Sequence, residues 1–202
     1  LEVIRRDQSD RGLSTEFSDM AIDELLRMHE LAERMLDTNR PDSTGTGVSD
    51  IGHVVGQIAD LYRAGAEDRS WSLVVELDEQ FPEVKAQVPP DALKQVLMNL
   101  VENAREVTPT KGIVRIAVDV EGDTARVRVI DDGPGIEPDV LPKIFDPFFT
   151  TKGAVTGVGL GLFVAQGVVR RYGGRLFAEN RESGGACFTV ELPVASETAV
   201  PA

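Results

Sequence analysis

The sequence predicts an α/β domain with a separate helix in front of it. Residues 16–36 repeat with the period of a helix, whereas strand-like and helix-like runs alternate between residues 51 and 193. A length of 202 residues with 42% hydrophobic content suits one sizeable core and a short additional element. We therefore expect mixed helices and strands in the larger part of the chain.

Residues 16–36 are predicted to form an amphipathic helix. Its apolar seam recurs at steps of four and three residues and consists of Ala21, Leu25, Met28, Ala32 and Met35. So broad a stripe needs partner helices, which predicts a homodimer through this N-terminal helix. Pro41 and nearby glycines end the helix, so residues 41–50 are expected to be a linker.

A second amphipathic helix is predicted after Ser49, with Ile51, Val54, Ile58 and Leu61 on one face. Residues 71–77 alternate as a strand does. Asp91 is a good N-cap for a helix that continues to about residue 107.

The remaining elements follow from turn chemistry. Residues 112–120 and 124–130 are predicted strands, because a Glu-Gly-Asp hairpin signal lies between them. Residues 159–172 are predicted to be helical and to end at Gly173 and Gly174. Two last strands, 175–180 and 186–192, flank a Gly-Gly turn, and residues 194–202 are expected to be a flexible tail.

Composition excludes several classes of protein. A formal net charge of -13 argues against nucleic-acid binding, which needs clustered Lys and Arg. Cys187 is the single cysteine, so the chain cannot form an internal disulfide, which fits the cytoplasm. Its apolar runs are far shorter than the roughly 20 residues of a membrane helix, so we expect no membrane contact within this chain.

Asp131 begins an Asp-Asp-Gly-Pro-Gly segment at the end of a predicted strand. A carboxylate at a sharp backbone turn can accept a hydrogen bond from an exocyclic amine such as that of adenine. An ordinary turn is the alternative, because these residues are strong turn formers.

Two further groups of residues are candidates for binding phosphate and a metal ion. Glycines 157, 159 and 161 precede a helix, so backbone N–H groups can face a phosphate; a dinucleotide fold would need a strand directly before them. Asn99 and Asn103 lie one helical turn apart. An asparagine of this kind, taken alone, more often hydrogen-bonds to the backbone. If phosphate groups lie opposite the helix, Asn103 becomes a candidate Mg²⁺ ligand.

Four blocks, residues 99–104, 131–135, 144–152 and 157–162, occur in the order of the N box, first glycine box, F box and second glycine box. In this order they resemble the catalytic ATP-binding domain of sensor histidine kinases, in the GHKL superfamily. The resemblance implies a Bergerat-fold two-layer α/β sandwich with a mixed sheet over residues 51–193, preceded by part of a dimerisation and phosphotransfer region over residues 1–40. The Phe-Phe-Thr-Thr-Lys ending of the F box resembles the nitrogen-regulation subtype.

The resemblance also implies roles for individual residues. Asp131 binds the adenine amine, Asn103 coordinates Mg²⁺, and residues 136–158 form a lid that Phe145 and Phe149 anchor by packing. The ATP-contacting set it implies is Asn99, Asn103, Asp131, Gly133, Gly135, Ile136, Phe145, Phe149, Thr151, Lys152, Gly157, Val158, Gly159, Leu160 and Gly161.

The candidate catalytic residues are Glu102, Asn103 and Lys152. Glu102 is a candidate base for the acceptor imidazole, and a solvated helix glutamate is its alternative. Lys152 or Arg105 could replace the family's phosphate-reaching lysine, because Glu106 and Val107 stand where many members have Lys-Tyr.

Other positions depart from the family. Ala186 and Cys187 precede Phe188, where a threonine is usual, which leaves that hydrogen bond open. Residues 1–6 resemble those that follow an H box, and His29-Glu30 lacks the proline that such a box requires. Neither His29 nor His53 is therefore expected to be the phosphoacceptor.

The sequence thus predicts the ATP-binding core of a histidine kinase, with Mg²⁺ as cofactor and a response regulator receiver domain as partner. The acceptor histidine is expected outside this chain. The alternatives are a nucleotide-binding scaffold or phosphatase-biased pseudokinase, a GHKL ATPase, and an anti-sigma serine kinase. Asn99 disfavours the ATPase, since those families place a water-activating glutamate there.

Overall fold

The computed structural model describes residues 47–64, 71–77, 83–151 and 159–195. The chain divides into two compact units, Leu1–Gly45 and Thr46–Ala202, and every described residue belongs to the second. The predicted dimer helix at residues 16–36 lies outside the described residues.

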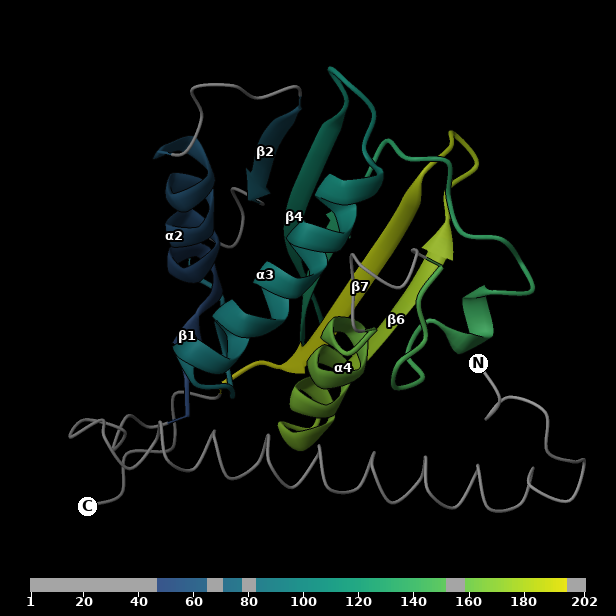
Figure 1. Cartoon of the computed structure of the whole chain (residues 1–202). Coiled ribbons are helices and arrows are strands. Elements are labelled where there is room, and N and C mark those ends of the chain that lie inside the picture. Colours follow the sequence, from purple (N-terminus) through teal and green to yellow (C-terminus); the bar gives the residue numbers. More distant parts are fainter. Residues whose placement is uncertain (1–46, 65–70, 78–82, 152–158, 196–202) are drawn as a thin grey trace, which may run out of the picture. The chain divides into compact units, whose positions relative to one another are not determined.

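The second unit is built on a five-stranded sheet with the order β2-β4-β5-β7-β6 (Figure 1). Its strands are β2 (Ser72–Leu77), β4 (Ile113–Glu121), β5 (Thr124–Ile130), β7 (Ala186–Pro193) and β6 (Arg175–Asn180). The β2–β4 pair is parallel and the other pairs are antiparallel, so the sheet is mixed. A small second sheet pairs β1 (Ser49–Asp50) with β3 (Lys85–Ala86).

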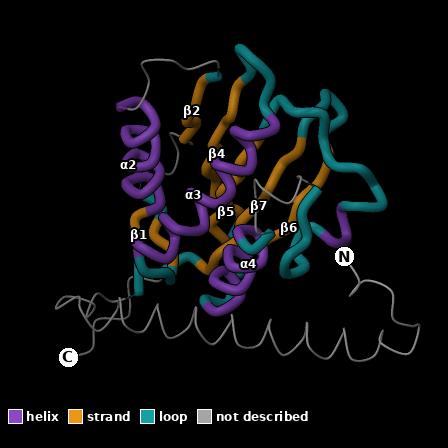
Figure 2. Tube along the Cα trace, viewed as in Figure 1, coloured by secondary structure: helices purple, strands orange, loops and turns teal. Residues whose placement is uncertain are grey.

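Helices cover one face of the large sheet (Figures 1 and 2). They are α2 (Ile51–Ala64), α3 (Pro90–Val107) and α4 (Gly161–Arg171), and a short 3₁₀ helix, η1, spans Leu141–Lys143. Apolar side chains of α3 and of β4, β5 and β7 fill the layer between helices and sheet, among them Leu97, Leu100, Ile116, Val127 and Val190. The predicted two-layer α/β sandwich with a mixed sheet is confirmed.

Local turn chemistry explains the elements that were predicted correctly. Glu121 pairs with Thr124, so Gly122 and Asp123 form a tight hairpin turn, and Gly122 has a φ of +59°. Gly173, with a φ of +73°, follows the end of α4 in the way glycines commonly terminate helices.

Two details of the prediction were wrong. The N-cap of α3 is Pro89, not Asp91, because Pro90 occupies the first helical position, where a missing N–H costs nothing; Asp91 lies in the first turn. Leu61 is 50% exposed, whereas Tyr62, four residues after Ile58, completes the buried face of α2.

Candidate functional site

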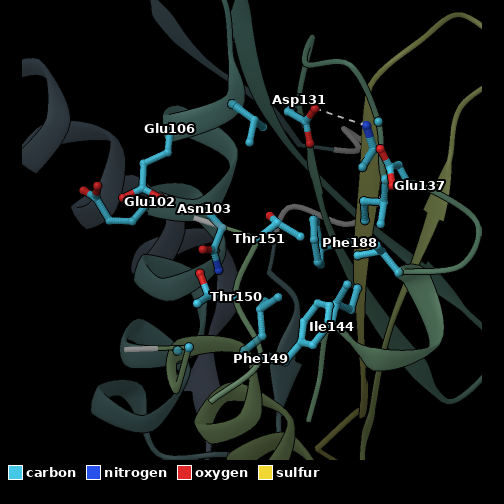
Figure 3. A pocket seen from close by; sticks show the side chains of 18 of the residues that line it. Glu102, Asn103, Glu106, Asp131, Glu137, Ile144, Phe149, Thr150, Thr151 and Phe188 are labelled. Carbon is cyan, nitrogen blue, oxygen red and sulfur yellow. Dashed lines mark hydrogen bonds between the residues drawn. The ribbon is translucent and has the colours of Figure 1, made fainter. Parts of the chain in front are cut away.

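A cleft of about 970 Å³ opens between α3, the segment after β5, the start of α4 and β7. In Figure 3, Glu102, Asn103 and Glu106 of α3 stand on one side, with Glu137 opposite and Asp131 at one end. Ile144, Phe149 and Phe188 give part of the wall an apolar surface. Cavities of this size that combine apolar walls with a few polar groups are typical of small-ligand sites.

Asp131 directly follows β5 and is 1% exposed. Its Oδ1 accepts hydrogen bonds from the backbone N–H of Gly133 at 2.8 Å and of Ala186 at 3.1 Å. Its Oδ2 is buried and has no hydrogen-bond partner within the described part of the chain. Burial raises the pKa of Asp131, although the two backbone bonds and the charge of Arg181 oppose this shift. One acceptor oxygen at the end of the cleft therefore lacks a donor.

Neighbouring groups fix the backbone around Asp131. Arg181 Nη1 donates to the Asp131 carbonyl at 3.3 Å and lies 3.7 Å from Asp132 Oδ1. Asp132 Oδ2 accepts the Ile113 N–H at 2.9 Å. A β-carbon at Gly185 would lie only 2.0 Å from the Asp131 carbonyl oxygen, so this contact requires glycine.

One face of α3 supplies polar side chains to the cleft. Asn99 Nδ2 donates to the Gly161 carbonyl at 3.2 Å, which ties α3 to the first residue of α4. Asn103 lines the cleft one turn further along. The amide of Asn103 is thus placed between the α4 end of the cleft and the Asp131 end.

Glu102 is held by two donors. The Tyr62 hydroxyl donates to Oε1, and Arg105 Nε donates to Oε2 at 2.7 Å. Partial burial raises the pKa of Glu102, but the hydrogen bonds from Tyr62 and Arg105 outweigh burial, so the pKa is lowered overall. A carboxylate held in this way is a weaker proton acceptor than a free one.

Gly159 lets the start of α4 approach the segment before it. Its φ is +72°, and a β-carbon there would lie 2.6 Å from the Phe148 carbonyl carbon and 2.6 Å from Phe149 O. Two residues later α4 begins, and the N–H groups of its first turn have no partner within the helix. Such N–H groups favour an anion.

The structure brings together most of the predicted site residues. The predicted residues that line the cleft are Asn99, Glu102, Asn103, Asp131, Gly135, Ile136, Phe149, Thr151, Gly159, Leu160 and Gly161. Gly133 supports Asp131 through its N–H, and Phe145 packs against the core without lining the cleft. Lys152, Gly157 and Val158 lie outside the described residues.

Several lining residues were missed from the sequence. Glu106 could have been found, because it follows Asn103 by three and shares its helix face. Ala186 and Phe188 reach the cleft only because β7 pairs with β5. That pairing spans too many residues for a local pattern to show it.

The described residues contain no group of three or more His, Cys, Asp and Glu side chains placed to hold a metal ion. No described helix is long and apolar enough to cross a membrane.

Residues 89–196, more than half of the chain, match the family described as histidine kinase-, DNA gyrase B- and HSP90-like ATPases. The chain belongs to this family. Among its curated relatives is the sensor histidine kinase ZraS of Escherichia coli K12, 32% identical over 168 residues, which are 83% of this chain and 35% of ZraS. The chain thus spans about a third of the length of this relative.

Solved structures of histidine kinases are similar to this chain. The catalytic domain of histidine kinase ThkA matches with a TM-score of 0.63 and 32% identity, covering 72% of this chain and 93% of that one. Full-length ShkA in complex with AMPPNP matches with a TM-score of 0.64 and 28% identity, covering 75% of this chain and 31% of ShkA. The described unit is therefore a histidine kinase-type ATPase catalytic domain homologous to those of sensor histidine kinases.

Proposed function

We propose that this chain is the ATP-binding catalytic part of a sensor histidine kinase. It would transfer the γ-phosphoryl group of ATP to a histidine outside this chain, for relay to a response regulator. The observation that carries the proposal is the buried Asp131 carboxylate, whose Oδ2 lacks a donor at the end of the family's cleft.

An adenine ring suits this oxygen. Its exocyclic amine supplies the N–H donor that Oδ2 lacks, and a hydrogen bond to a charged acceptor is worth about 1.5–3 kcal/mol. An anionic group at the same place would instead be repelled by the carboxylate. ShkA, a relative with the same fold, was solved with an adenine nucleotide analogue, which supports the assignment.

Mg²⁺ fits the residues opposite. Asn103 would hold the ion through its amide oxygen, together with phosphate oxygens of the nucleotide, since hard Mg²⁺ prefers oxygen ligands. The ion supplies charge neutralisation for phosphoryl transfer. The chain's own residues position the nucleotide: the first turn of α4 offers N–H groups, and Thr151 and Gly159 line the same part of the cleft.

Transfer to histidine fits this chain better than hydrolysis does. ATPases of the superfamily activate water with a glutamate, and here Asn99 stands at that position with its amide bonded to Gly161. We further propose that the protein acts as a homodimer through residues 16–36, in the cytoplasm, with Lys152 or Arg105 near the phosphates. The nitrogen-regulation subtype stays a prediction.

Binding measurements test the proposal. The unaltered chain should bind MgADP in isothermal titration calorimetry, and Asp131→Asn should weaken binding at least about tenfold, in line with the loss of roughly 1.5–3 kcal/mol. Asp123→Asn changes an exposed carboxylate in the β4–β5 turn and should leave the affinity unchanged. Equal affinity of the unaltered chain and Asp131→Asn would contradict the assignment.

A further inference from the structure

The last residue of β6 and the turn that follows it hold the two ends of the loop that runs from Asp131 to Ile136. At the Ile136 end, Asn180 Oδ1 accepts the Ile136 N–H at 2.7 Å, and Asn180 Nδ2 donates to the Ile136 carbonyl at 2.6 Å. The side chain of Asn180 therefore satisfies both backbone groups of one residue, as a neighbouring strand would.

Gly135 makes room for this contact. Its φ is +82°, and a β-carbon there would lie 2.9 Å from Asn180 Oδ1. A side chain at position 135 would therefore push the amide of Asn180 away from Ile136. The two Asn180–Ile136 hydrogen bonds therefore require glycine at position 135.

The two ends of the loop are held separately. The Asp131 end is fixed by the N–H groups of Gly133 and Ala186 and by Arg181. Only the Asn180 pair, among the contacts of the described residues, bonds the backbone of Ile136 to β6. Ile136 lines the cleft and begins the wall that continues to Thr151. The position of Ile136 relative to Asp131 thus depends on Asn180, whereas apolar residues further along the wall, such as Val140 and Phe149, pack against the core.

We propose that Asn180 is a positioning residue for adenine nucleotide binding, acting through the backbone of Ile136. Asn180 itself is not among the described residues that line the cleft. The inference rests on the proposed function, because it concerns the same ligand. Its effect reaches the nucleotide through the wall and not through direct contact.

The first test compares Asn180→Ala with Glu179→Ala, the neighbouring exposed position on β6. Asn180→Ala should bind MgADP about five- to tenfold more weakly, because nucleotide binding must then order the backbone of Ile136, which has a free-energy cost of about this size, and Glu179→Ala should bind normally. The Ile136 amide of Asn180→Ala should exchange with solvent faster in the nucleotide-free state, as measured by NMR. The midpoint of thermal unfolding should stay close to that of the unaltered chain, because Asn180 is exposed.

A double-mutant cycle tests the mechanism. Gly135→Ala strains the backbone in either background, and this strain cancels in the cycle. Its clash with Asn180 exists only when Asn180 is present, so Gly135→Ala should weaken MgADP binding less in the Asn180→Ala background. Additive effects would overturn the mechanism.

The outcomes separate the two proposals. Failure of the unaltered chain to bind MgADP would contradict the proposed function, and this inference with it. Normal binding by both the unaltered chain and Asn180→Ala, or an unchanged exchange rate of the Ile136 amide, would overturn the inference alone.

Discussion

Asp131 combines a functional advantage with a cost to the folded state. Burial raises its pKa, so the folded domain binds a proton at this carboxyl more tightly than the unfolded chain does. The resulting stabilisation is present below the unfolded value of about 3.9 and is lost as pH rises through the folded pKa. At neutral pH the ionised group therefore destabilises the nucleotide-free domain.

Relative to the unaltered nucleotide-free chain, Asp131→Asn should consequently gain stability as pH rises, because it carries no group that ionises there, while it weakens nucleotide binding. The Asn oxygen can still accept the N–H groups of Gly133 and Ala186. Urea unfolding between pH 4 and pH 8 should show the advantage of the variant growing with pH. A difference in stability that stays constant across this range would refute the explanation.

Asn103 should act through the metal and not through the base. Asn103→Ala should weaken binding of ATP about tenfold or more when Mg²⁺ is present, because one oxygen ligand is lost. The affinity for adenosine without Mg²⁺ should change less than about twofold, because Asn103 then has no metal ion to coordinate. Calorimetry with both ligands makes the comparison; equal losses would show that the amide is structural.

The sequence could predict that Asp131 and Asn103 lie at one site, because each belongs to a short motif, and both line the cleft. It could not show that Asp131 Oδ2 lacks a donor, or that Glu102 is held by Tyr62. Asn180 was missed for the same reason. These facts depend on partners 40 to 55 residues away in the chain, which only the fold brings together.

At the scale of elements, the junction between the wall of the cleft and α4 depends on Gly159. Gly159→Ala should destabilise the domain by about 1–3 kcal/mol, because it forces a positive φ on alanine and pushes its β-carbon into the backbone of Phe148 and Phe149. MgADP binding should weaken as the start of α4 shifts. Both effects are measured by thermal unfolding and calorimetry.

Gly167→Ala, within α4, is the matched control. Gly167 is exposed, and a β-carbon there would meet nothing within 4 Å. Alanine should therefore stabilise α4 by about 0.5–1 kcal/mol without altering the cleft. Similar losses in the two variants would show that the contact of Gly159 with Phe148 and Phe149 is not what matters.

Elements set by local signals were the easiest to predict. The hairpin at Gly122 and the end of α4 at Gly173 follow from turn and cap chemistry. The order of the sheet was out of reach: β2 joins β4 in parallel, and β6 takes the far edge beside β7. Such pairings depend on packing between distant segments. Asp91 shows a smaller limit, because two good helix starters, proline and aspartate, were adjacent and proline took the first position.

At the scale of the whole molecule, the chain should act on an acceptor histidine that lies outside residues 1–202. Its two histidines are His29, outside the described residues, and His53, which is exposed on α2 and hydrogen-bonds Gln57 at 2.9 Å. Neither lies in an H-box pattern. Incubation with ATP labelled on the γ-phosphate should therefore give no stable, acid-labile label on this chain.

The same chain should label a separate helical hairpin that carries a sensor-kinase H box, because the proposed nucleotide site would position the adenine and phosphate groups that transfer requires. Asp131→Asn should slow this transfer at subsaturating ATP at least about tenfold, in line with the lost charged hydrogen bond. His53→Gln should leave the rate unchanged, since His53 lies on α2 and does not line the cleft among the described residues. Label found on this chain and abolished by His29→Gln would place the acceptor within it, so the hairpin assay and the histidine variants together decide where phosphoryl transfer ends.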